Sequence, residues 1–352
     1  MTFAPPGMDQ TAAVKPQLSV STPAHTLGTL RPTGVPQLHH RVYYRIEPVS
    51  RSRILTNTWQ KEGVITELWI GVIAGLAYLA ASAGVFALGS SYYSLFRTNE
   101  SWTFKGLLVA AFAPITWLTM SGSHNDGIGL LALAFLAAAL ANLLGTAAGT
   151  WLPRPLRLRN DSLKGIALLK ALEAVVVVGT ILVILLIARI PFRFVYLSLG
   201  KLSLGLAIGL GGFALFGVGA LFQARSLRIE RSILVGVLPW ILLFVFANAF
   251  MEELWLRALF LKPLISLVGP IAAITLTAAV FALLHIGAAY MPKEDRIRFL
   301  IILFPLGLAW GACLFLTGSI IASALFHAGA DLIVVNGFIA NLHGQPKERV
   351  TA

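Results

Sequence analysis

The chain has 352 residues, of which 57% are hydrophobic and 12% are charged, and its mean hydropathy is +0.81. These values exclude a soluble globular domain and predict an all-α polytopic membrane protein embedded in lipid. The formal net charge is +12, but the Lys and Arg residues lie in short clusters between apolar runs. That pattern favours the positive-inside rule over nucleic-acid binding.

Residues 1–60 are polar and repeatedly interrupted by proline, without the apolar core of a signal peptide. We therefore expect a disordered, proline-rich cytosolic tail. Nine apolar runs follow, and most approach the roughly 20 residues that a spanning helix needs. The runs are 64–88, 107–120, 127–144, 165–190, 204–222, 239–262, 270–287, 297–316 and 319–341.

The second run is the exception among these segments. It is short, contains Pro114 and is followed by the polar turn 121–126. It either spans the membrane or re-enters on the side from which it came. Leaving it out gives a bundle of about eight transmembrane helices.

Basic residues indicate which side of the membrane faces the cytosol. Those around the last four helices fall on one side: Arg225, Arg228, Arg231, Lys293, Arg296, Arg298, Lys347 and Arg349. The positive-inside rule places this side and the C-terminus in the cytosol. A cytosolic N-terminal tail then requires an even number of spans. We expect an integral membrane protein, in the plasma membrane if it is bacterial, with both termini cytosolic.

Three ionisable residues interrupt the sixth apolar run, namely Glu252, Glu253 and Arg257. An ionisable group at the centre of a membrane helix costs at least ~2.5 kcal/mol, so three together need mutual compensation or a function. Pro239 is expected to start this helix and Pro263 to end it, because proline suits a first helical turn and breaks an interior one.

Two later runs carry polar groups of their own, His285 in one and His327 with Asp331 in the other. A rise of 1.5 Å per residue places Glu252 roughly 15 Å and His285 roughly 22 Å from the non-cytosolic ends of their helices. The same rise places His327 roughly 12 Å and Asp331 roughly 18 Å from the non-cytosolic end of their helix. Three independently delimited helices thus predict one intramembrane site.

A spacing of four residues, which puts two side chains on one helix face, recurs in this set. It joins Asn248 with Glu252, Glu253 with Arg257, Phe281 with His285, and His327 with Asp331. We expect Glu253 and Arg257 to form an ion pair and Asn248 to orient Glu252. We also expect Asp331 to fix the tautomer of His327.

Simpler interpretations stay open at each position. A histidine in a membrane helix often forms a helix-to-helix hydrogen bond, and intramembrane acids also mark proton or ion pathways. Lys170 and Glu173, three residues apart in the fourth run, are expected to form a helix-surface pair near the interface. As a set, however, carboxylates, imidazoles and an arginine supply the base and the oxyanion donors of a hydrolase.

The motifs Glu252-Glu253-x-x-x-Arg257, Phe281-x-x-x-His285 and His327-x-x-x-Asp331 occur in this order in the last four helices. They resemble the three motifs of the CAAX prenyl protease and bacteriocin-processing (Abi) family of intramembrane endopeptidases, over about residues 233–340. Leu256 and Ala258 depart from the family, which often has an aromatic residue and a glycine there. The resemblance implies N-terminal transmembrane helices at 61–230, a CAAX-protease-like catalytic core at 231–341 and a short C-terminal tail at 342–352.

The resemblance further implies that Glu252 and His285 activate water against a scissile carbonyl, while His327 and Asp331 hold the oxyanion. Because an ionised carboxylate cannot donate, Asp331 suits the orientation of His327 better, and Arg257 would hold Glu253. Family members are described both as metalloproteases and as metal-free. The cofactor is therefore either none or a divalent metal such as zinc, with Glu252, His285 and His327 as candidate ligands.

The implied partner is a peptide or a lipidated protein. Eukaryotic members remove the last three residues from a prenylated C-terminus, and bacterial members are linked to peptide maturation and bacteriocin immunity. A non-catalytic scaffold or self-immunity protein is the alternative, against which the intact Glu252, His285 and His327 argue. A secondary transporter would show inverted repeats, and the sequence shows no such symmetry.

Overall fold

The computed structural model describes residues 59–88, 98–121, 127–153, 155–156, 158, 161–287 and 296–344. The predicted tail lies outside these ranges except for its last two residues, as do most of 342–352, most of the turn 121–126, and Lys293, Lys347 and Arg349. The chain divides into two compact units, one of them Gln10–Thr66, of which only the start of the first helix is described. All packing discussed below lies within the other unit, which contains Glu67–Ala352.

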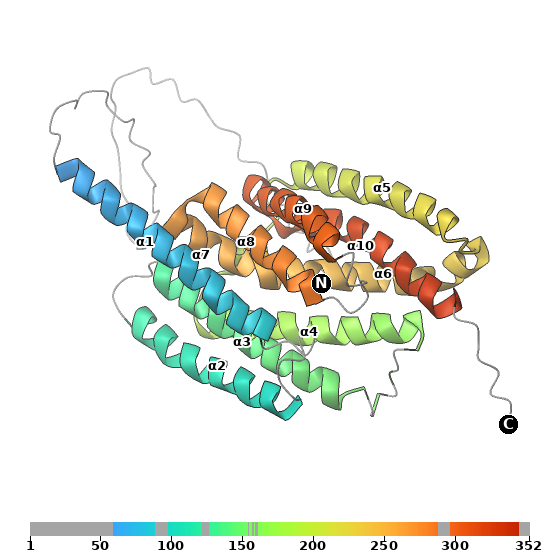
Figure 1. Ribbon diagram of the computed structural model, residues 1–352, viewed down its shortest axis with the longest axis horizontal. Coiled ribbons are helices and arrows are strands. Elements are labelled where there is room, and N and C mark those ends of the chain that lie inside the picture. The colour runs from blue at the N-terminus through green and yellow to red at the C-terminus, as the bar shows by residue number, and fades with distance from the viewer. Residues whose placement is uncertain are drawn as a thin grey trace, which may run out of the picture. The chain divides into compact units, whose positions relative to one another are not determined.

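Every regular element of the described chain is a helix (Figure 1). The α-helices are α1 (Trp59–Ser82), α2 (Thr98–Met120), α3 (Gly127–Trp151), α4 (Leu163–Ile187), α5 (Leu202–Ser226), α6 (Arg231–Glu252), α7 (Leu259–Val268), α8 (Pro270–Leu284), α9 (Arg296–Thr317) and α10 (Ile320–Gly344). Two π-helices, η1 (Ala83–Leu88) and η4 (Glu253–Ala258), and two 3-10 turns, η3 (Phe192–Val195) and η5 (His285–Gly287), complete them.

Eight helical segments of the described chain are long and apolar enough to cross a membrane, which confirms the predicted number. The set of segments that can span differs from the predicted set at two points. The second run forms α2, a helix of 23 residues that continues through Pro114. The shorter apolar helix is instead Pro270–Leu284, which leads into His285. The predicted helix through 287 is thus wrong at its end, because the chain tightens into η5.

Proline does not delimit the helix that carries the two glutamates, contrary to the prediction. α6 begins at Arg231 with Pro239 inside it, and α7 contains Pro263 and ends at Val268. Arg231–Val268 is one continuous apolar helical segment. Water is absent from a hydrocarbon layer, so leaving the helix would expose more unpaired backbone groups than a proline does, and the helix continues.

The helices from both halves of the chain pack in one bundle. α2 packs on α3, α3 on α4, α4 on α6, α6 on α10 and α8 on α9, and these pairs lie side by side in Figure 1. The contact between α5 and α10 is the most extensive. A Cβ on Gly329 of α10 would lie 2.6 Å from the Cα of Phe213 in α5. The backbones therefore approach as closely as small residues allow in membrane helices.

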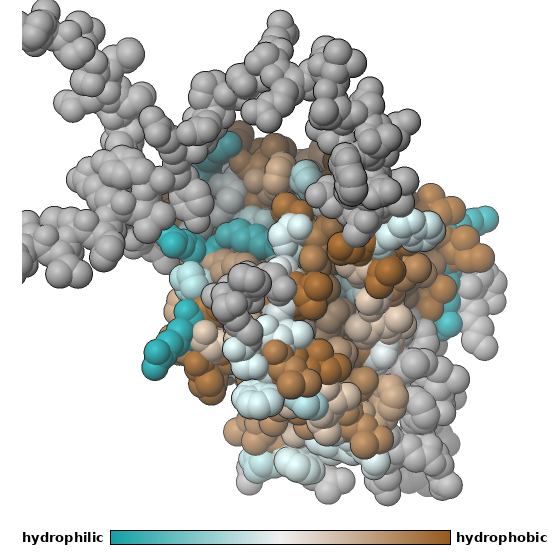
Figure 2. Space-filling view, turned by 90° about the vertical axis from the view of Figure 1, so that its left-hand side faces the viewer, coloured by the Kyte–Doolittle hydropathy of each residue, from teal (hydrophilic) through white to brown (hydrophobic). Residues whose placement is uncertain are grey.

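The outer surface is strongly apolar, as one face shows in Figure 2. Large side chains such as Trp117, Val175 and Ile187 are 70%, 70% and 74% exposed. Exposed apolar surface of this extent suits contact with lipid. The length and composition of the helices and this surface together describe an integral membrane protein.

We predict that Gly329→Ala destabilises the bundle by about 1–3 kcal/mol, because the added methyl group overpacks against the α5 backbone. Gly337→Ala, on the same helix, is the control, since a Cβ there meets nothing within 4 Å. Thermal unfolding in detergent measures both. Equal melting temperatures for the two variants would contradict the close approach of α5 and α10.

Candidate active site

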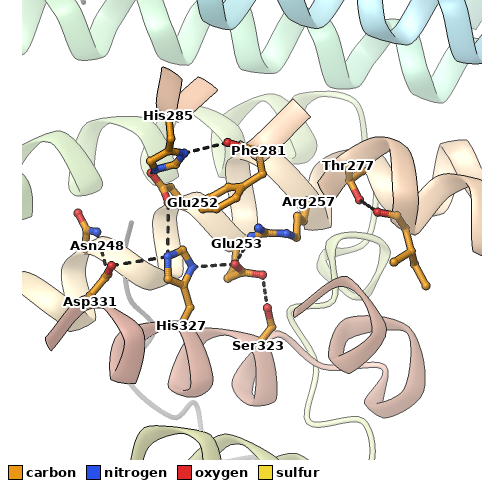
Figure 3. A network of polar contacts seen from close by, with 11 residues as sticks. Asn248, Glu252, Glu253, Arg257, Thr277, Phe281, His285, Ser323, His327 and Asp331 are labelled. Carbon is orange, nitrogen blue, oxygen red and sulfur yellow. Dashed lines mark hydrogen bonds and ion pairs between the residues drawn. The ribbon is translucent and has the colours of Figure 1, made fainter. Parts of the chain in front are cut away.

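Side chains from α6, η4, α8, η5 and α10 converge on one polar cluster inside the bundle, drawn in Figure 3. The cluster comprises Asn248, Glu252, Glu253, Arg257, Phe281, His285, Ser323, His327 and Asp331. It brings together all six predicted site residues. The prediction of a single intramembrane cluster from three separate helices is therefore met by the geometry, although the roles of its members stay predictions.

Glu253 is the centre of the cluster and is fully buried. Its Oε1 atom pairs with the guanidinium of Arg257 and lies 2.8 Å from Nδ1 of His327. Its Oε2 atom accepts a hydrogen bond from the hydroxyl of Ser323. The predicted ion pair with Arg257 is present, and three partners on two elements satisfy this one carboxylate.

Arg257 is buried completely and is held by aromatic rings on its other faces. Its guanidinium carbon lies 4.0 Å from the ring centre of Phe281 and 5.0 Å from that of Trp310. Its Nε and Nη2 atoms have no hydrogen-bond partner among the described residues. Cation–π attraction from two desolvated rings, worth about 2 kcal/mol or more at such sites, offsets part of that cost.

Glu252 has a different environment from its neighbour. Its Oε1 lies 3.8 Å from Nε2 of His285, and its Oε2 lies 3.5 Å from Nε2 of His327. Both separations exceed a direct hydrogen bond, and a water molecule can bridge polar groups at such a distance. Glu252 thus lies close to two imidazole nitrogens without a direct hydrogen bond to either.

The backbone fixes the tautomer of His285. Its Nδ1 lies 2.8 Å from the carbonyl oxygen of Phe281, one turn earlier. A carbonyl oxygen can only accept, so Nδ1 carries the proton and the neutral ring presents the lone pair of Nε2 to Glu252. The predicted relation of Phe281 to His285 therefore acts through the main chain as well as through the rings, whose centres are 4.5 Å apart.

His327 is clamped between two aromatic rings. The indole of Trp310 stacks on it at 4.0 Å with an angle of 11° between planes, and Phe281 meets its edge at 5.6 Å. Both aromatic side chains are buried. With Glu253 at Nδ1, these contacts fix the plane of the imidazole and the direction of its Nε2 atom.

Asn248 and Asp331 differ from their expected partners. Asn248 donates to Oδ2 of Asp331 at 2.7 Å, so the expectation that it orients Glu252 is wrong. Oδ1 of Asp331 lies 3.7 Å from Nε2 of His327, whereas Glu253 is at hydrogen-bonding distance from the opposite nitrogen. A carboxylate from another helix displaces the one that shares a helix with the imidazole.

Ser323 of the cluster and Trp310 beside it were not predicted from the sequence. Ser323 precedes His327 by four residues, so the polar face of α10 could have been extended by one turn. Trp310 carries no such signal, because an aromatic residue in an apolar helix is ordinary. Its place is decided by the packing of α9 on α8 and α10.

A comparison with protein families matches residues 234–333 to type II CAAX prenyl endopeptidases of the Rce1-like family. This region is Rce1-like. The matched region contains every predicted site residue. The match agrees with the resemblance inferred from the three motifs and supports an intramembrane protease function. Comparisons with curated proteins and with solved structures give no match.

The candidate metal ligands of the Rce1-like region do not form a ligand set in this arrangement. Among the residues that the structure describes, no group of three His, Cys, Asp or Glu side chains is placed to hold a metal ion. Glu252, His285 and His327 approach one another pairwise, as given above, without meeting at one point. The choice between no cofactor and a divalent metal stays a prediction.

We predict unequal stability effects for the two adjacent glutamates. Glu253→Gln leaves Arg257 as an uncompensated buried charge and should destabilise the protein by about 3–5 kcal/mol. Glu252→Gln breaks no arginine pair and should change stability by less than about 1 kcal/mol.

Thermal unfolding of both variants in the same detergent provides the measurement. The isosteric replacement is the same in each, so one variant is the control for the other. A larger loss at Glu252 than at Glu253 would show that the ion pair does not stabilise the cluster.

Proposed function

We propose that this protein is an intramembrane endopeptidase that hydrolyses a peptide bond with water activated by Glu252 and His285. The observation that carries the proposal is the contrast between the two glutamates. Glu253 is neutralised by Arg257, whereas Glu252 lies 3.8 Å and 3.5 Å from imidazole nitrogens, beyond a direct hydrogen bond. One carboxylate is structural and the other is available for proton transfer.

In the proposed reaction, water donates hydrogen bonds to Glu252 and to Nε2 of His285. Glu252 takes one proton as the water oxygen bonds to the scissile carbonyl carbon. The tetrahedral intermediate then collapses, the carbon–nitrogen bond breaks and Glu252 returns the proton to the leaving amine. A positioned acid–base group of this kind contributes about 10²- to 10⁴-fold to the rate.

His327 is proposed to stabilise the oxyanion. In the protonated imidazole both nitrogens carry hydrogens, so Nδ1 can donate to Glu253 while Nε2 donates to the oxyanion. Trp310 and Phe281 hold the ring in one plane, so this donor is oriented before the charge develops. Asp331 lies beyond hydrogen-bonding distance from the ring, and we propose that it adds electrostatic support while Asn248 holds it in place.

The substrate is proposed to be a lipidated or membrane-associated protein or peptide cleaved near its C-terminus, as CAAX-type processing requires. The basic residues Arg225, Arg228 and Arg231 support a cytosolic position for their end of the bundle, by the positive-inside rule. The end of α10 lies on the same side, because Asn336 donates to the carbonyl of Ala220 near the end of α5. Such a substrate would enter from the cytosolic leaflet.

A metal has no part in the steps proposed above. Glu252, His285 and His327 stay the candidate ligands of a divalent ion, although the described arrangement does not bring them together as a ligand set. The alternative function, a non-catalytic scaffold or immunity protein, is favoured by no separate contact in the described residues.

We predict that detergent-purified protein cleaves peptides from a quenched lipidated library, and that Glu252→Gln and His285→Ala lower kcat by about 10²- to 10⁴-fold. Each protein is assayed with and without a chelator, which tests the metal. Unfolding curves confirm that the variants are folded. If the wild type cleaves no peptide of the library faster than the two variants do, the peptidase proposal fails and a scaffold role is favoured.

We also predict that Trp310 positions His327. Trp310→Leu removes the stacked ring and should lower kcat by about two- to tenfold, the range expected from an aromatic pair, with little change in KM. Trp310→Phe keeps a ring and should recover most of the rate. Equal kcat values for the two variants would mean that Trp310 fills space without orienting the imidazole.

A further inference from the structure

α1 runs antiparallel to the helical segment that carries the two glutamates. Three contacts join the two, and the residue number of the partner falls as that of α1 and η1 rises. The pairs are Gly71 with Leu267, Tyr78 with Phe260, and Phe86 with Trp255. A Cβ at the first position would lie 3.4 Å from the carbonyl oxygen of its partner, and the ring centres of the other two pairs are 5.5 Å and 5.1 Å apart. Because all of these residues belong to one compact unit, the direction of α1 within the bundle is fixed.

α10 runs antiparallel to the same segment. Asn248 donates to Asp331, and Glu253 accepts from Ser323, so the residue numbers again change in opposite directions. α1 and α10 are therefore parallel, and both run toward the end of the bundle at which Arg231 begins α6. In Figure 1, accordingly, α1 begins and α10 finishes at opposite ends of the bundle.

The short helix α8 makes a further pass between these two ends. A Cβ on Gly307 would lie 3.1 Å from Cα of Ala278, and a Cβ on Gly311 would lie 3.1 Å from Cγ2 of Ile274, so α8 and α9 are antiparallel. α8 therefore returns the chain to the end at which α9 begins with Arg296. It adds one pass to the eight long segments, which makes the number of passes in the described chain odd.

We propose that α1 enters the membrane from the non-cytosolic side, so that the chain before α1 and the end of α10 lie on opposite sides of the membrane. The expectation from the sequence placed both termini in the cytosol, with an even number of spans. That number left out the run 107–120, whereas the structure has the full helix α2 there and the pass of α8 besides. The contacts of α1 then place its beginning at the end opposite to Arg231.

The charge of the connecting segments assigns the cytosolic end. Every connection at the end of Arg231 carries Lys or Arg, and these connections are 89–97, 152–162, 227–230 and 288–295. At the opposite end, 188–201 carries basic residues, whereas 121–126, Gly269 and 318–319 carry none. Connections rich in Lys and Arg are retained in the cytosol. Basic residues also precede α1, between Arg41 and Lys61, so the orientation calls for a direct measurement.

The proposed topology separates the segment before α1 from the substrate. This consequence rests on the proposed function, in which the substrate enters from the cytosolic leaflet. Residues 1–58 would then lie across the membrane from that entrance, and they could neither cover it nor recruit a cytosolic substrate. They would instead be open to partners on the non-cytosolic side.

Disulfide cross-linking tests the direction of α1. The background is Cys313→Ala, which removes the only cysteine of the chain. A Cβ at position 71 would lie 3.9 Å from Cγ1 of Val268, close to the Cβ separation of about 3.5–4.5 Å in a disulfide. Gly71→Cys combined with Val268→Cys should therefore cross-link upon mild oxidation in membranes, measured as a loss of labelling by a maleimide polymer that a reductant restores.

Gly84→Cys with Val268→Cys is the matched control. Gly84 lies about 20 Å further along the helix by its rise per residue, and a Cβ there would contact Leu108 of α2, so this pair should stay reduced. Cross-linking of the control pair in place of the first pair would mean that α1 runs in the reverse direction, which would overturn the proposal. If neither pair cross-links, α1 does not pack on α7 in this register and the proposal fails as well.

An impermeant maleimide then assigns the sides in intact spheroplasts. In the same background, Ser52→Cys reports on the segment before α1, Lys201→Cys on the connection 188–201 and Ser226→Cys on the end of α5, and the last two positions are exposed. Ser52→Cys and Lys201→Cys should be labelled to the same extent from outside, and Ser226→Cys only after permeabilisation. Labelling of Ser52→Cys and Ser226→Cys from the same side overturns the proposal.

Neither measurement requires activity, so this inference is judged separately from the proposed function. Labelling of Ser226→Cys alone in intact spheroplasts would place the start of α1 in the cytosol and would also overturn the inference. An active peptidase with Ser52→Cys and Ser226→Cys on one side would keep the proposed function and lose this inference. Protein without activity but with the expected labels and cross-link would do the reverse.

Discussion

A carboxylate inside a hydrocarbon layer is tolerated only beside groups that neutralise it and satisfy its lone pairs, and the pair of Glu253 with Arg257 meets this condition. The same carboxylate contacts Ser323 and His327, so the ion pair ties η4 to α10. The geometry of the remaining cluster follows from this link. Glu252, one residue earlier, points toward the imidazoles without an arginine of its own.

Aromatic side chains also hold Arg257 and His327 in place, in addition to their hydrogen bonds. Phe281 and Trp310 lie against the guanidinium of Arg257 and against the imidazole of His327. One pair of rings thus contacts both a buried guanidinium and a buried imidazole.

The sequence was sufficient for what depends on cost and spacing. Ionisable groups in apolar runs are expensive, so their convergence followed from depth, and the four-residue spacing predicted the pair of Glu253 with Arg257. Which side chains meet across two helices could not be predicted from the sequence. Asn248 and Asp331 were assigned to partners on their own helices, yet they contact each other across α6 and α10. Helix ends were misjudged at Pro239 and Pro263, because a lipid environment favours continued hydrogen bonding over termination.

The π-helix η4 lies between two helices with different neighbours, since α6 packs on α10 and α7 packs on α3. A π-turn contains one residue more than an α-turn of the same rise, and it often marks a functional site. One residue added to a regular α-helix would rotate everything after it by about 100°, because each residue turns the helix by that angle. The wider turn of η4 takes up the additional residue locally, so α7 keeps its rotational phase relative to the half that carries Glu252. Sequence length in this segment is constrained as strictly as residue identity.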